Sequence, residues 1–361
     1  MTNILYIGKY NGIVGGIERY MQKSAELLRR NSFAVHYLYT ENGGKEPESF
    51  ANAFDTVQIF SPENNWLKNA DMVIIHNIIG VEYLPFMPKK KTFFFAHDHN
   101  IYCQRHHYYT PIGRINCHRK YNKFICKLCS LGRNEAPPLA EYRKLPALVL
   151  SDFMAENLRK NGFEKVVKLP AFIKTTEKEH NFMPDGVLRI LFLGQLIRGK
   201  GADLMLKTLA ELDIPFECTI AGEGKDRQML EALVKKYKLQ KKVHFTGFVS
   251  EPEKLWDNCD VFFFPIRWQE PFGLVGLEAM AHGVPVVAFD LGGVREWLSD
   301  LENGIAIPEK KVVAAAGFLG SLSGNREALE DMGNRGRKLA KEKFSEENFI
   351  KNFNKLCGVL L

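Results

Sequence analysis

Short apolar runs alternate with segments of helical period along almost the whole chain. The runs are nearly continuous in Val, Ile, Leu and Phe, as expected of strands that are buried on both faces. Such strands, separated by helices, indicate parallel sheets that are covered by helices on both sides. The expected strands span 4–7, 34–39, 56–60, 72–76, 92–96, 147–150, 188–193, 216–221, 243–246, 261–264 and 284–288, and the expected helices span 17–30, 202–212, 225–237 and 274–282.

The strands form two series, and the chain of 361 residues is longer than a single hydrophobic core usually supports. Residues 174–186, between the series, have no apolar period and contain Pro-Asp-Gly, which is typical of a linker. We therefore expect an α/β protein with two Rossmann-like parallel-sheet domains, 1–173 and 187–343, which face a central cleft at the carboxyl ends of their strands. Residues 344–361 are expected to form a C-terminal helix that crosses back to the first domain.

Two glycine-rich turns each follow a strand and open a helix. The first contains Gly15 and Gly16, and the second, at 192–201, holds Arg198 and Lys200 among three glycines. Backbone N–H groups at a helix start and fixed cations both stabilise an anion, such as a departing diphosphate. Each turn also has a purely structural interpretation, because glycine is favoured wherever the backbone turns sharply.

Two glutamates mark the segment 261–288. Glu270 lies on a loop before the expected helix, and Glu278 lies inside that helix among apolar residues. One carboxylate is suited to accept hydrogen bonds from a ribose diol and the other from sugar hydroxyls. The N–H groups at the start of the helix, from residues 272–274, are expected to point into the cleft. A surface role for Glu278 is disfavoured, because its helix runs between buried strands.

Three further motifs accompany these segments: Gly-Gly-Ile-Glu-Arg at 15–19, Ala-Gly-Glu-Gly at 221–224 and Gly-Gly-Val-Arg-Glu at 292–296. Taken together, the segments and motifs resemble the family 4 retaining glycosyltransferases of the GT-B fold. The likeness covers nearly all of the C-terminal half and, more sparsely, residues 1–100. It implies an acceptor-side first domain and a second domain that binds the donor. The implied reaction moves a hexose-type sugar from a nucleotide diphosphate sugar to a glycan, lipid-linked or small-molecule acceptor, with retention and without a catalytic cofactor. Polysaccharide or lipopolysaccharide biosynthesis is the expected setting.

The resemblance also implies roles for individual residues. The implied catalytic residues are His97 and Asp98 near the transferred sugar, Lys200 on the diphosphate and Glu270 on the donor sugar. Val249 is expected to read the base through its backbone, and Glu278 to bind the ribose. The full set of expected donor-binding residues is Gly15, Gly16, Gln195, Arg198, Val249, Phe272, Gly273, Leu274 and Glu278.

The phosphate-binding loop departs from the family pattern at one position. Gln195 stands where the family usually has Arg, so one arm of the implied phosphate clamp is neutral. Arg198, from the same loop, is the candidate for the missing cation. The family needs no enzymic nucleophile, since the leaving phosphate can take the acceptor proton itself.

A basic insert rich in Cys and His lies at about 97–133. Ten Lys or Arg and one acidic residue fall between residues 89 and 133, which favours an anionic neighbour such as a phospholipid surface, a lipid-linked phosphate or nucleic acid, with a solvated loop as the equal alternative. The insert also holds five of the ten histidines. Its four cysteines, which include a CxxC pair, suit a structural Zn²⁺ or an iron–sulfur cluster, with free thiols as the alternative; they are Cys103, Cys117, Cys126 and Cys129.

Two other functions remain as alternatives. One is a nucleotide-sugar epimerase of the same fold. The other is nucleic-acid binding through the insert, although only Tyr108, Tyr109 and Tyr121 interleave with its basic residues, so no nucleic-acid partner is expected. The chain lacks a recognisable leader and any apolar run of membrane-spanning length, which predicts a cytoplasmic protein that is peripheral at the inner face of the membrane.

Overall fold

The computed structural model describes residues 1–89, 91–110, 115–132, 135–176, 179–183, 185–249 and 251–358. Three basic residues of the segment 89–133 (Lys90, Arg114 and Arg133) lie outside the described residues, as do residues 177, 178 and 184 of the predicted linker. The chain divides into two compact units, Met1–Pro170 with Glu346–Leu361, and Ala171–Ser345. The division therefore falls before the predicted linker, whose described residues belong to the second unit.

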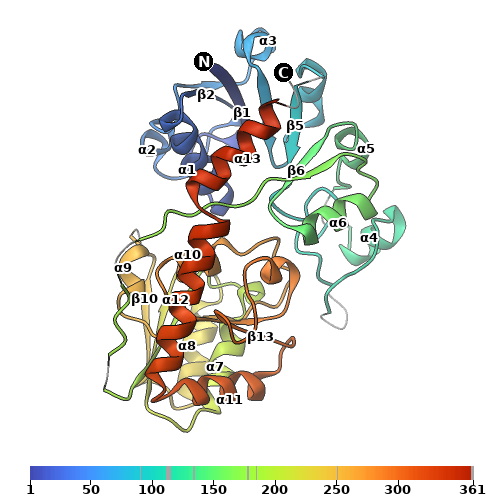
Figure 1. Ribbon diagram of the computed structural model, residues 1–361. Coiled ribbons are helices and arrows are strands. Elements are labelled where there is room, and N and C mark those ends of the chain that lie inside the picture. The colour runs from blue at the N-terminus through green and yellow to red at the C-terminus, as the bar shows by residue number, and fades with distance from the viewer. Residues whose placement is uncertain are drawn as a thin grey trace. The chain divides into compact units, whose positions relative to one another are not determined.

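The first unit is built on a seven-stranded parallel sheet in the order β3-β2-β1-β4-β5-β6-β7 (Figure 1). Its strands are β1 Thr2–Tyr10, β2 Phe33–Glu41, β3 Thr56–Ile59, β4 Met72–His76, β5 Thr92–Phe95, β6 Ala147–Val149 and β7 Val166–Lys168. Its helices are α1 Gly16–Arg30, α2 Pro47–Ala51, α3 Trp66–Asn69, η1 Val81–Phe86, α4 Lys123–Cys129, α5 Leu139–Tyr142, α6 Asp152–Lys160 and α13 Glu346–Gly358.

Helix α13, drawn in red in Figure 1, belongs to this unit although it ends the described chain. The ring of Phe353 packs edge-on against Phe33 of β2, with 5.4 Å between the centroids. At the start of the helix, Glu346 pairs with Arg30 at 3.0 Å. An apolar face and one ion pair thus attach a segment more than 300 residues away in sequence to the first sheet.

The second unit contains a six-stranded parallel sheet in the order β10-β9-β8-β11-β12-β13. Its strands are β8 Leu188–Leu193, β9 Phe216–Ala221, β10 Val243–Gly247, β11 Val261–Phe264, β12 Val286–Phe289 and β13 Gly304–Ile307. Its helices are η2 Arg198–Lys200, α7 Ala202–Ala210, α8 Arg227–Lys236, α9 Glu253–Trp256, α10 Leu274–Ala281, η3 Gly292–Glu296, α11 Val312–Leu322 and α12 Arg326–Lys343. The predicted α/β class with two parallel sheets is confirmed.

The structure differs from the sequence-based elements at a few places. Strand β7 was not predicted, because it has three residues and no buried position, and neither was β13, which begins at a glycine with a φ of 148°. Strand β12 begins two residues later than predicted, since Val284 still donates its N–H to the carbonyl of Ala279 at the end of α10. Of the helices in the described ranges, none combines the length and the apolar character that spanning a membrane requires.

Candidate active site

The second sheet reverses its strand order between β8 and β11. Strands β9 and β10 extend the sheet on one side of β8, and β12 and β13 extend it on the other side of β11. The loops that follow β8 and β11 therefore leave neighbouring strands in opposite directions, which is where open parallel sheets form ligand sites. Lys200 lies on the first of these loops and Glu270 on the second.

Lys200 and Glu270 form an ion pair at this position. The Lys200 Nζ donates to Glu270 Oε2 at 2.9 Å, with side-chain exposures of 25% and 15%. The same ammonium lies 6.0 Å from the ring centroids of Phe264 and Trp268, within cation–π range. Two predicted site residues that are 70 positions apart in sequence are thus brought into direct contact.

Glycines allow the two loops to pack backbone against backbone. Gly201 has a φ of 76°, and a Cβ at this position would lie 1.7 Å from the carbonyl oxygen of Pro265. A Cβ on Gly199 would lie 2.1 Å from the ring of Trp268. The backbone N–H of Arg267 donates to the Gly199 carbonyl at 2.9 Å. Gly199 and Gly201 of the predicted phosphate loop are therefore required by packing and, for Gly201, also by backbone conformation.

A third loop fixes the backbone of Glu270. Gly293 donates its N–H to the Glu270 carbonyl at 2.7 Å. Gly292 has a φ of 69°, and a Cβ there would lie 2.1 Å from the same carbonyl oxygen. Glu270 is thus held from the β12 side by backbone contacts and from the β8 side by Lys200, which limits the number of positions its carboxylate can adopt.

Helix α10 begins beside Glu270. Its N-cap is Gly273, which has a φ of 87° and supplies no side-chain cap, so the first N–H groups of the helix have no partner from a capping side chain. Trp297 braces this end, because its Nε1 donates to the carbonyl of Phe272 at 2.7 Å. Leu274 is the first helical residue, and Glu278 lies half-buried one turn further along.

The other expected donor-binding residues of this unit are on two loops of the same sheet. Gln195 and Arg198 are both exposed on the loop after β8. Val249 is half-buried and follows β10, whose last residue, Gly247, accepts a hydrogen bond from the N–H of Gly222 at 2.8 Å. A Cβ on Gly222 would lie 1.9 Å from the Gly194 oxygen, so the loops after β8, β9 and β10 are also packed together through glycine.

In the first unit, Gly15 and Gly16 lie at the start of α1. Gly15 is the N-cap and is extended, with a φ of −166°, a conformation open to any residue. Its N–H donates to Glu18 Oε2 at 2.8 Å. A Cβ on Gly16 would meet no heavy atom within 4 Å. Neither packing nor backbone conformation requires these two glycines, which favours the interpretation that a ligand approaches the bare backbone.

His97 and Asp98 follow β5 in the same unit. His97 Nε2 lies 2.9 Å from Nδ1 of His76, a buried residue at the end of β4. Asp98 accepts hydrogen bonds from the Asn77 side chain at 3.1 Å and from the backbone N–H of Asn100 at 2.9 Å. Asn77 has a φ of 64°, an uncommon conformation that turns its side chain back toward the loop after the neighbouring strand.

Burial shifts the protonation of this pair away from ordinary values. It lowers the pKa of His97 to about 3, so the imidazole is neutral at pH 7. It raises the pKa of Asp98 to about 6, although the hydrogen bonds from Asn100 and Asn77 act in the opposite direction and nearby Glu18 adds to the rise. His76, fully enclosed and beside His97, has a pKa well below its usual value. The group is thus a set of neutral hydrogen-bonding side chains around one carboxyl.

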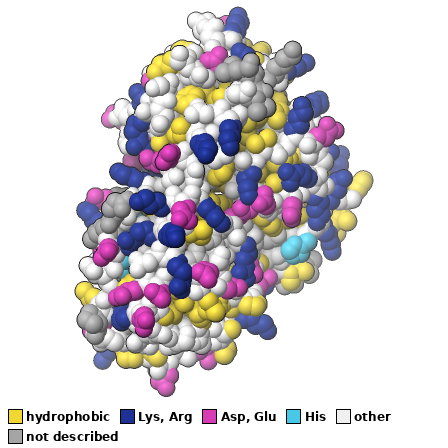
Figure 2. All heavy atoms as spheres, viewed as in Figure 1, with side chains coloured by type: hydrophobic (Ala, Val, Ile, Leu, Met, Phe, Trp, Pro, Cys, Tyr) yellow, Lys and Arg dark blue, Asp and Glu magenta, His cyan; other side chains and the backbone are white. Residues whose placement is uncertain are grey.

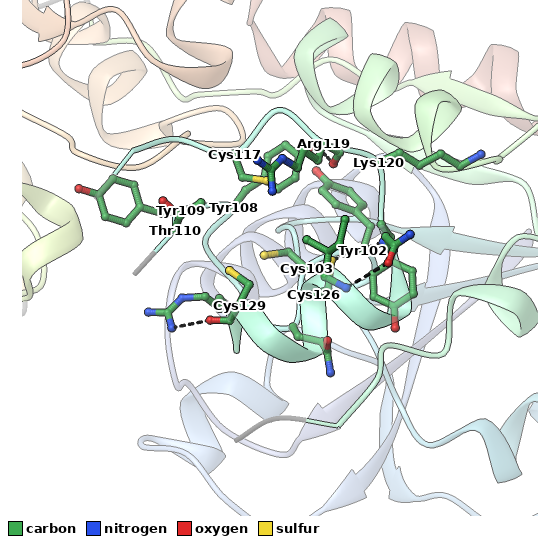
Figure 3. A pocket seen from close by; sticks show the side chains of 15 residues that line it. Tyr102, Cys103, Tyr108, Tyr109, Thr110, Cys117, Arg119, Lys120, Cys126 and Cys129 are labelled. Atoms are coloured by element: carbon green, nitrogen blue, oxygen red, sulfur yellow. Dashed lines mark hydrogen bonds between the residues drawn. The ribbon is translucent and has the colours of Figure 1, made fainter. Parts of the chain in front are cut away.

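The four cysteines of the insert line a single pocket of the first unit, with a volume of about 320 Å³ (Figure 3). All four are free thiols and half-buried. Within the described ranges, no group of three or more His, Cys, Asp or Glu side chains is arranged closely enough to hold a metal ion. The structure therefore brings Cys103, Cys117, Cys126 and Cys129 to one pocket, but it does not bring three of their sulfurs to one point.

Several residues of the site were not predicted. Asn77 and His76 had a weak signal, namely polar residues at the end of a buried strand. Arg267 had none: it is buried and pairs with Asp203 at the start of α7, which anchors the Glu270 loop to the Lys200 loop. Trp268 also had no signal in the sequence. Only the three-dimensional arrangement shows that its ring lies against Gly199 and near the Lys200 ammonium.

Comparisons with known proteins identify similar sequences for the second unit. Residues 173–339 match the family model described as Glycosyl transferases group 1, which covers most of the second unit and slightly less than half of the chain. The glycosyltransferase MJ1607 of Methanocaldococcus jannaschii, described as uncharacterized, is 34% identical over 45% of this chain and 42% of its own length. The O-antigen biosynthesis glycosyltransferase WclY of Escherichia coli is 37% identical over 32% of this chain and 31% of its own. The chain thus spans less than half the length of either relative.

A solved structure extends the likeness to the whole fold. The crystal structure of HepE from Anabaena, in complex with UDP and glucose, matches with a TM-score of 0.73 and 14% identity, over 99% of this chain and 100% of that one. An identity this low establishes the fold alone. Together with the two parallel sheets, it confirms the predicted GT-B class.

Proposed function

We propose that the chain is a retaining glycosyltransferase that moves a hexose-type sugar from a nucleotide diphosphate sugar to a glycan, lipid-linked or small-molecule acceptor. The observation that carries the proposal is the pair of Lys200 and Glu270 at 2.9 Å, on the loops where the strand order reverses. A nucleotide sugar presents an anionic diphosphate next to a ring of hydroxyl groups, and this pair offers a cation and a carboxylate side by side. The match of residues 173–339 to the group 1 glycosyltransferases supports the same activity.

The pair also suggests how the donor is bound. A diphosphate competes with Glu270 for the Lys200 ammonium, so donor binding exchanges one ion pair for another. The released carboxylate is then free to accept hydrogen bonds from the sugar hydroxyls. Because a fixed cation stabilises charge that grows as the bond to the leaving group breaks, Lys200 contributes more in the transition state than in the ground state.

The reaction balances without an enzymic nucleophile. The bond between the anomeric carbon and the diphosphate oxygen breaks, and a bond from the acceptor hydroxyl oxygen forms on the same face of the sugar. The acceptor proton passes to the departing phosphate oxygen. In this scheme Glu278 binds the ribose and the backbone at Gly15 and Gly16 approaches the diphosphate. Asp98 and the neutral imidazole of His97 bind the transferred sugar.

A biosynthetic setting at a membrane fits one feature of the first unit. Helix α4 exposes Phe124 (83%), Leu128 (74%) and Ile125 (46%) to solvent. Lys123 and Lys127 are exposed on the same helix, and in Figure 2 blue side chains gather beside yellow ones at the right edge of this unit. Apolar side chains flanked by cations suit an anionic lipid surface. Similarity to an O-antigen biosynthesis glycosyltransferase supports lipid-linked or lipopolysaccharide acceptors.

A donor screen tests the activity. The full-length protein is incubated with common nucleotide diphosphate sugars, and free nucleotide, released sugar and altered nucleotide sugar are measured. We expect slow hydrolysis of one donor that accelerates when an acceptor is added, and loss of donor affinity in Glu278→Ala. A nucleotide sugar that changes its configuration without releasing nucleotide would instead establish the epimerase alternative. No turnover and no binding of any donor would remove the proposal.

A vesicle assay tests the membrane surface separately. We expect co-sedimentation with phosphatidylglycerol vesicles and little with phosphatidylcholine vesicles, and weakening of the binding between low and 0.5 M salt, where the Debye length falls to about 4 Å. The double change Phe124→Ser with Leu128→Ser is expected to reduce binding severalfold. Val313→Ser, at a residue of the second unit that is 68% exposed, is the matched control. Binding that ignores both salt and the α4 substitutions would contradict the proposal.

A further inference from the structure

The four-cysteine pocket of the first unit is not used by the proposed glycosyl transfer. Its cysteines come from three separate segments of the insert: Cys103 after β5, Cys117 beside Tyr108, and the pair Cys126 and Cys129 on α4. Figure 3 shows the four side chains directed into the same pocket from around its wall. Its lining includes none of the main residues proposed for sugar transfer, namely Gly16, His97, Asp98, Lys200, Glu270 and Glu278.

A backbone N–H group points at one of the sulfurs. The N–H of Asn122 donates to Cys126 Sγ at 3.5 Å. A neutral thiol is a weak acceptor, whereas a thiolate gains a charge-assisted hydrogen bond from each such donor. The N–H of Asn122 would therefore stabilise a thiolate at Cys126.

Cations surround the same pocket. Arg105, Arg119 and Lys120 line it, and Arg105 also donates to the backbone carbonyl of Cys129 at 3.4 Å. A divalent ion held by four thiolates carries a net charge of −2, which these side chains offset. No acidic residue is among the lining residues. The basic character of the insert therefore has a local explanation in addition to the lipid surface.

The insert contains little regular secondary structure. Between β5 and α5 it contains one helix of seven residues, α4, and a single isolated bridge from Tyr109 to Asn116 among the described residues. Its cysteines are free thiols. Ile101, Tyr102 and Tyr108 anchor the insert in the core of the first unit, whereas α4 has no buried residue. A metal ion would therefore join α4, through Cys126 and Cys129, to the buried part of the insert.

We propose that Cys103, Cys117, Cys126 and Cys129 bind one structural Zn²⁺. The residue types fit a tetrahedral site of four thiolates, and Cys126 and Cys129 have the CxxC spacing that places two sulfurs on one ion. All four thiols line one pocket, and coordination at about 2.3 Å from a zinc ion would require their sulfurs to lie closer together than they do here. A redox-inert ion suits a site that holds loops together, since metal binding supplies folding free energy directly.

Metal analysis of the full-length protein, purified without chelator or a metal-affinity tag, tests the proposal. We expect about one zinc per chain, lost in the double change Cys126→Ser with Cys129→Ser and retained in Cys357→Ser, a buried cysteine of the same unit. Protein grown in cobalt is expected to show the thiolate-to-metal charge-transfer and d–d bands of a tetrahedral tetrathiolate site.

Because the double variant is at risk of misfolding, the wild-type protein provides a second measurement. A mercurial reagent is expected to modify four thiols and to release zinc in proportion. A neutral disulfide reagent is expected to leave the same four thiols unmodified. Wild-type protein without zinc and with four reactive thiols, or with iron and acid-labile sulfide, overturns the assignment. Zinc content is measured independently of sugar transfer, so failure of the proposed activity leaves this test intact.

Discussion

Replacing Lys200 with methionine removes the cation from the candidate site while it keeps most of the apolar stem. The Lys200 Nζ lies 2.9 Å from Glu270 Oε2, so the substitution leaves a carboxylate that is 15% exposed without its partner. At an effective dielectric constant of about 20, two charges at this distance attract by about 6 kcal/mol before desolvation is subtracted. Desolvation offsets most of this attraction.

The exposures of the two side chains set the net effect. Fully exposed pairs contribute about 0–1 kcal/mol, and breaking fully buried pairs costs about 3–5 kcal/mol. At 25% and 15% exposure, the Lys200 and Glu270 pair lies between these limits. We expect Lys200→Met to lower the free energy of unfolding by about 1–2 kcal/mol. Loss of a group that stabilises the leaving diphosphate is expected to lower kcat by about 10²–10³-fold.

Urea unfolding and nucleotide release are measured on the same preparations. Lys207→Met, at an exposed lysine of α7, is the matched control and is expected to change stability by less than about 0.5 kcal/mol with normal turnover. In a double-mutant cycle with Glu270→Gln, the two changes are expected to couple by about 1–2 kcal/mol. Turnover of Lys200→Met within about threefold of wild type would refute the role of Lys200 at the leaving group, and additive stability effects would refute the ion pair.

Three further predictions follow from the described geometry. Gly201→Ala is expected to cost at least about 3 kcal/mol in urea unfolding, since a Cβ would lie 1.7 Å from the Pro265 oxygen, whereas Gly324→Ala, at a similar φ of 72° but with open space, should cost about 1 kcal/mol; equal costs would show that packing is irrelevant. Gly16→Ala meets no heavy atom within 4 Å and should leave stability within about 0.5 kcal/mol while donor affinity falls at least about tenfold; unchanged affinity would count against a ligand at this backbone. Burial raises the pKa of Asp98 to about 6, so the protonated carboxyl stabilises the fold below pH of about 4 and this contribution is lost as the pH rises through about 6. The unfolding free energy of Asp98→Asn relative to wild type should therefore rise by about 2–3 kcal/mol between pH of about 4 and about 7, and identical pH profiles would contradict the shift.

The sequence by itself determined the fold class and most of its elements. Nearly continuous apolar runs such as 188–193 and 261–264 favour inner strands of a parallel sheet, and the structure has these strands at the predicted bounds. The glycine-rich turn at 192–201 located the loop of Lys200, and the two glutamates of the segment 261–288 located the loop of Glu270. Elements without a strong pattern, such as the exposed edge strand β7, were missed because their pairing depends on a neighbour rather than on their own residues.

Only the tertiary structure decided which side chains meet. Lys200 and Glu270 are 70 positions apart, and their contact follows from the crossover that makes β8 and β11 neighbours. The same holds for His76 with His97, and for Asn77, whose positive φ turns it toward Asp98. Periodicity indicates which face of each segment is buried, whereas strand order and backbone contacts through glycine determine the distances between side chains. The protonation of His97 and Asp98 depends on their burial in the folded protein, which no local sequence pattern indicates.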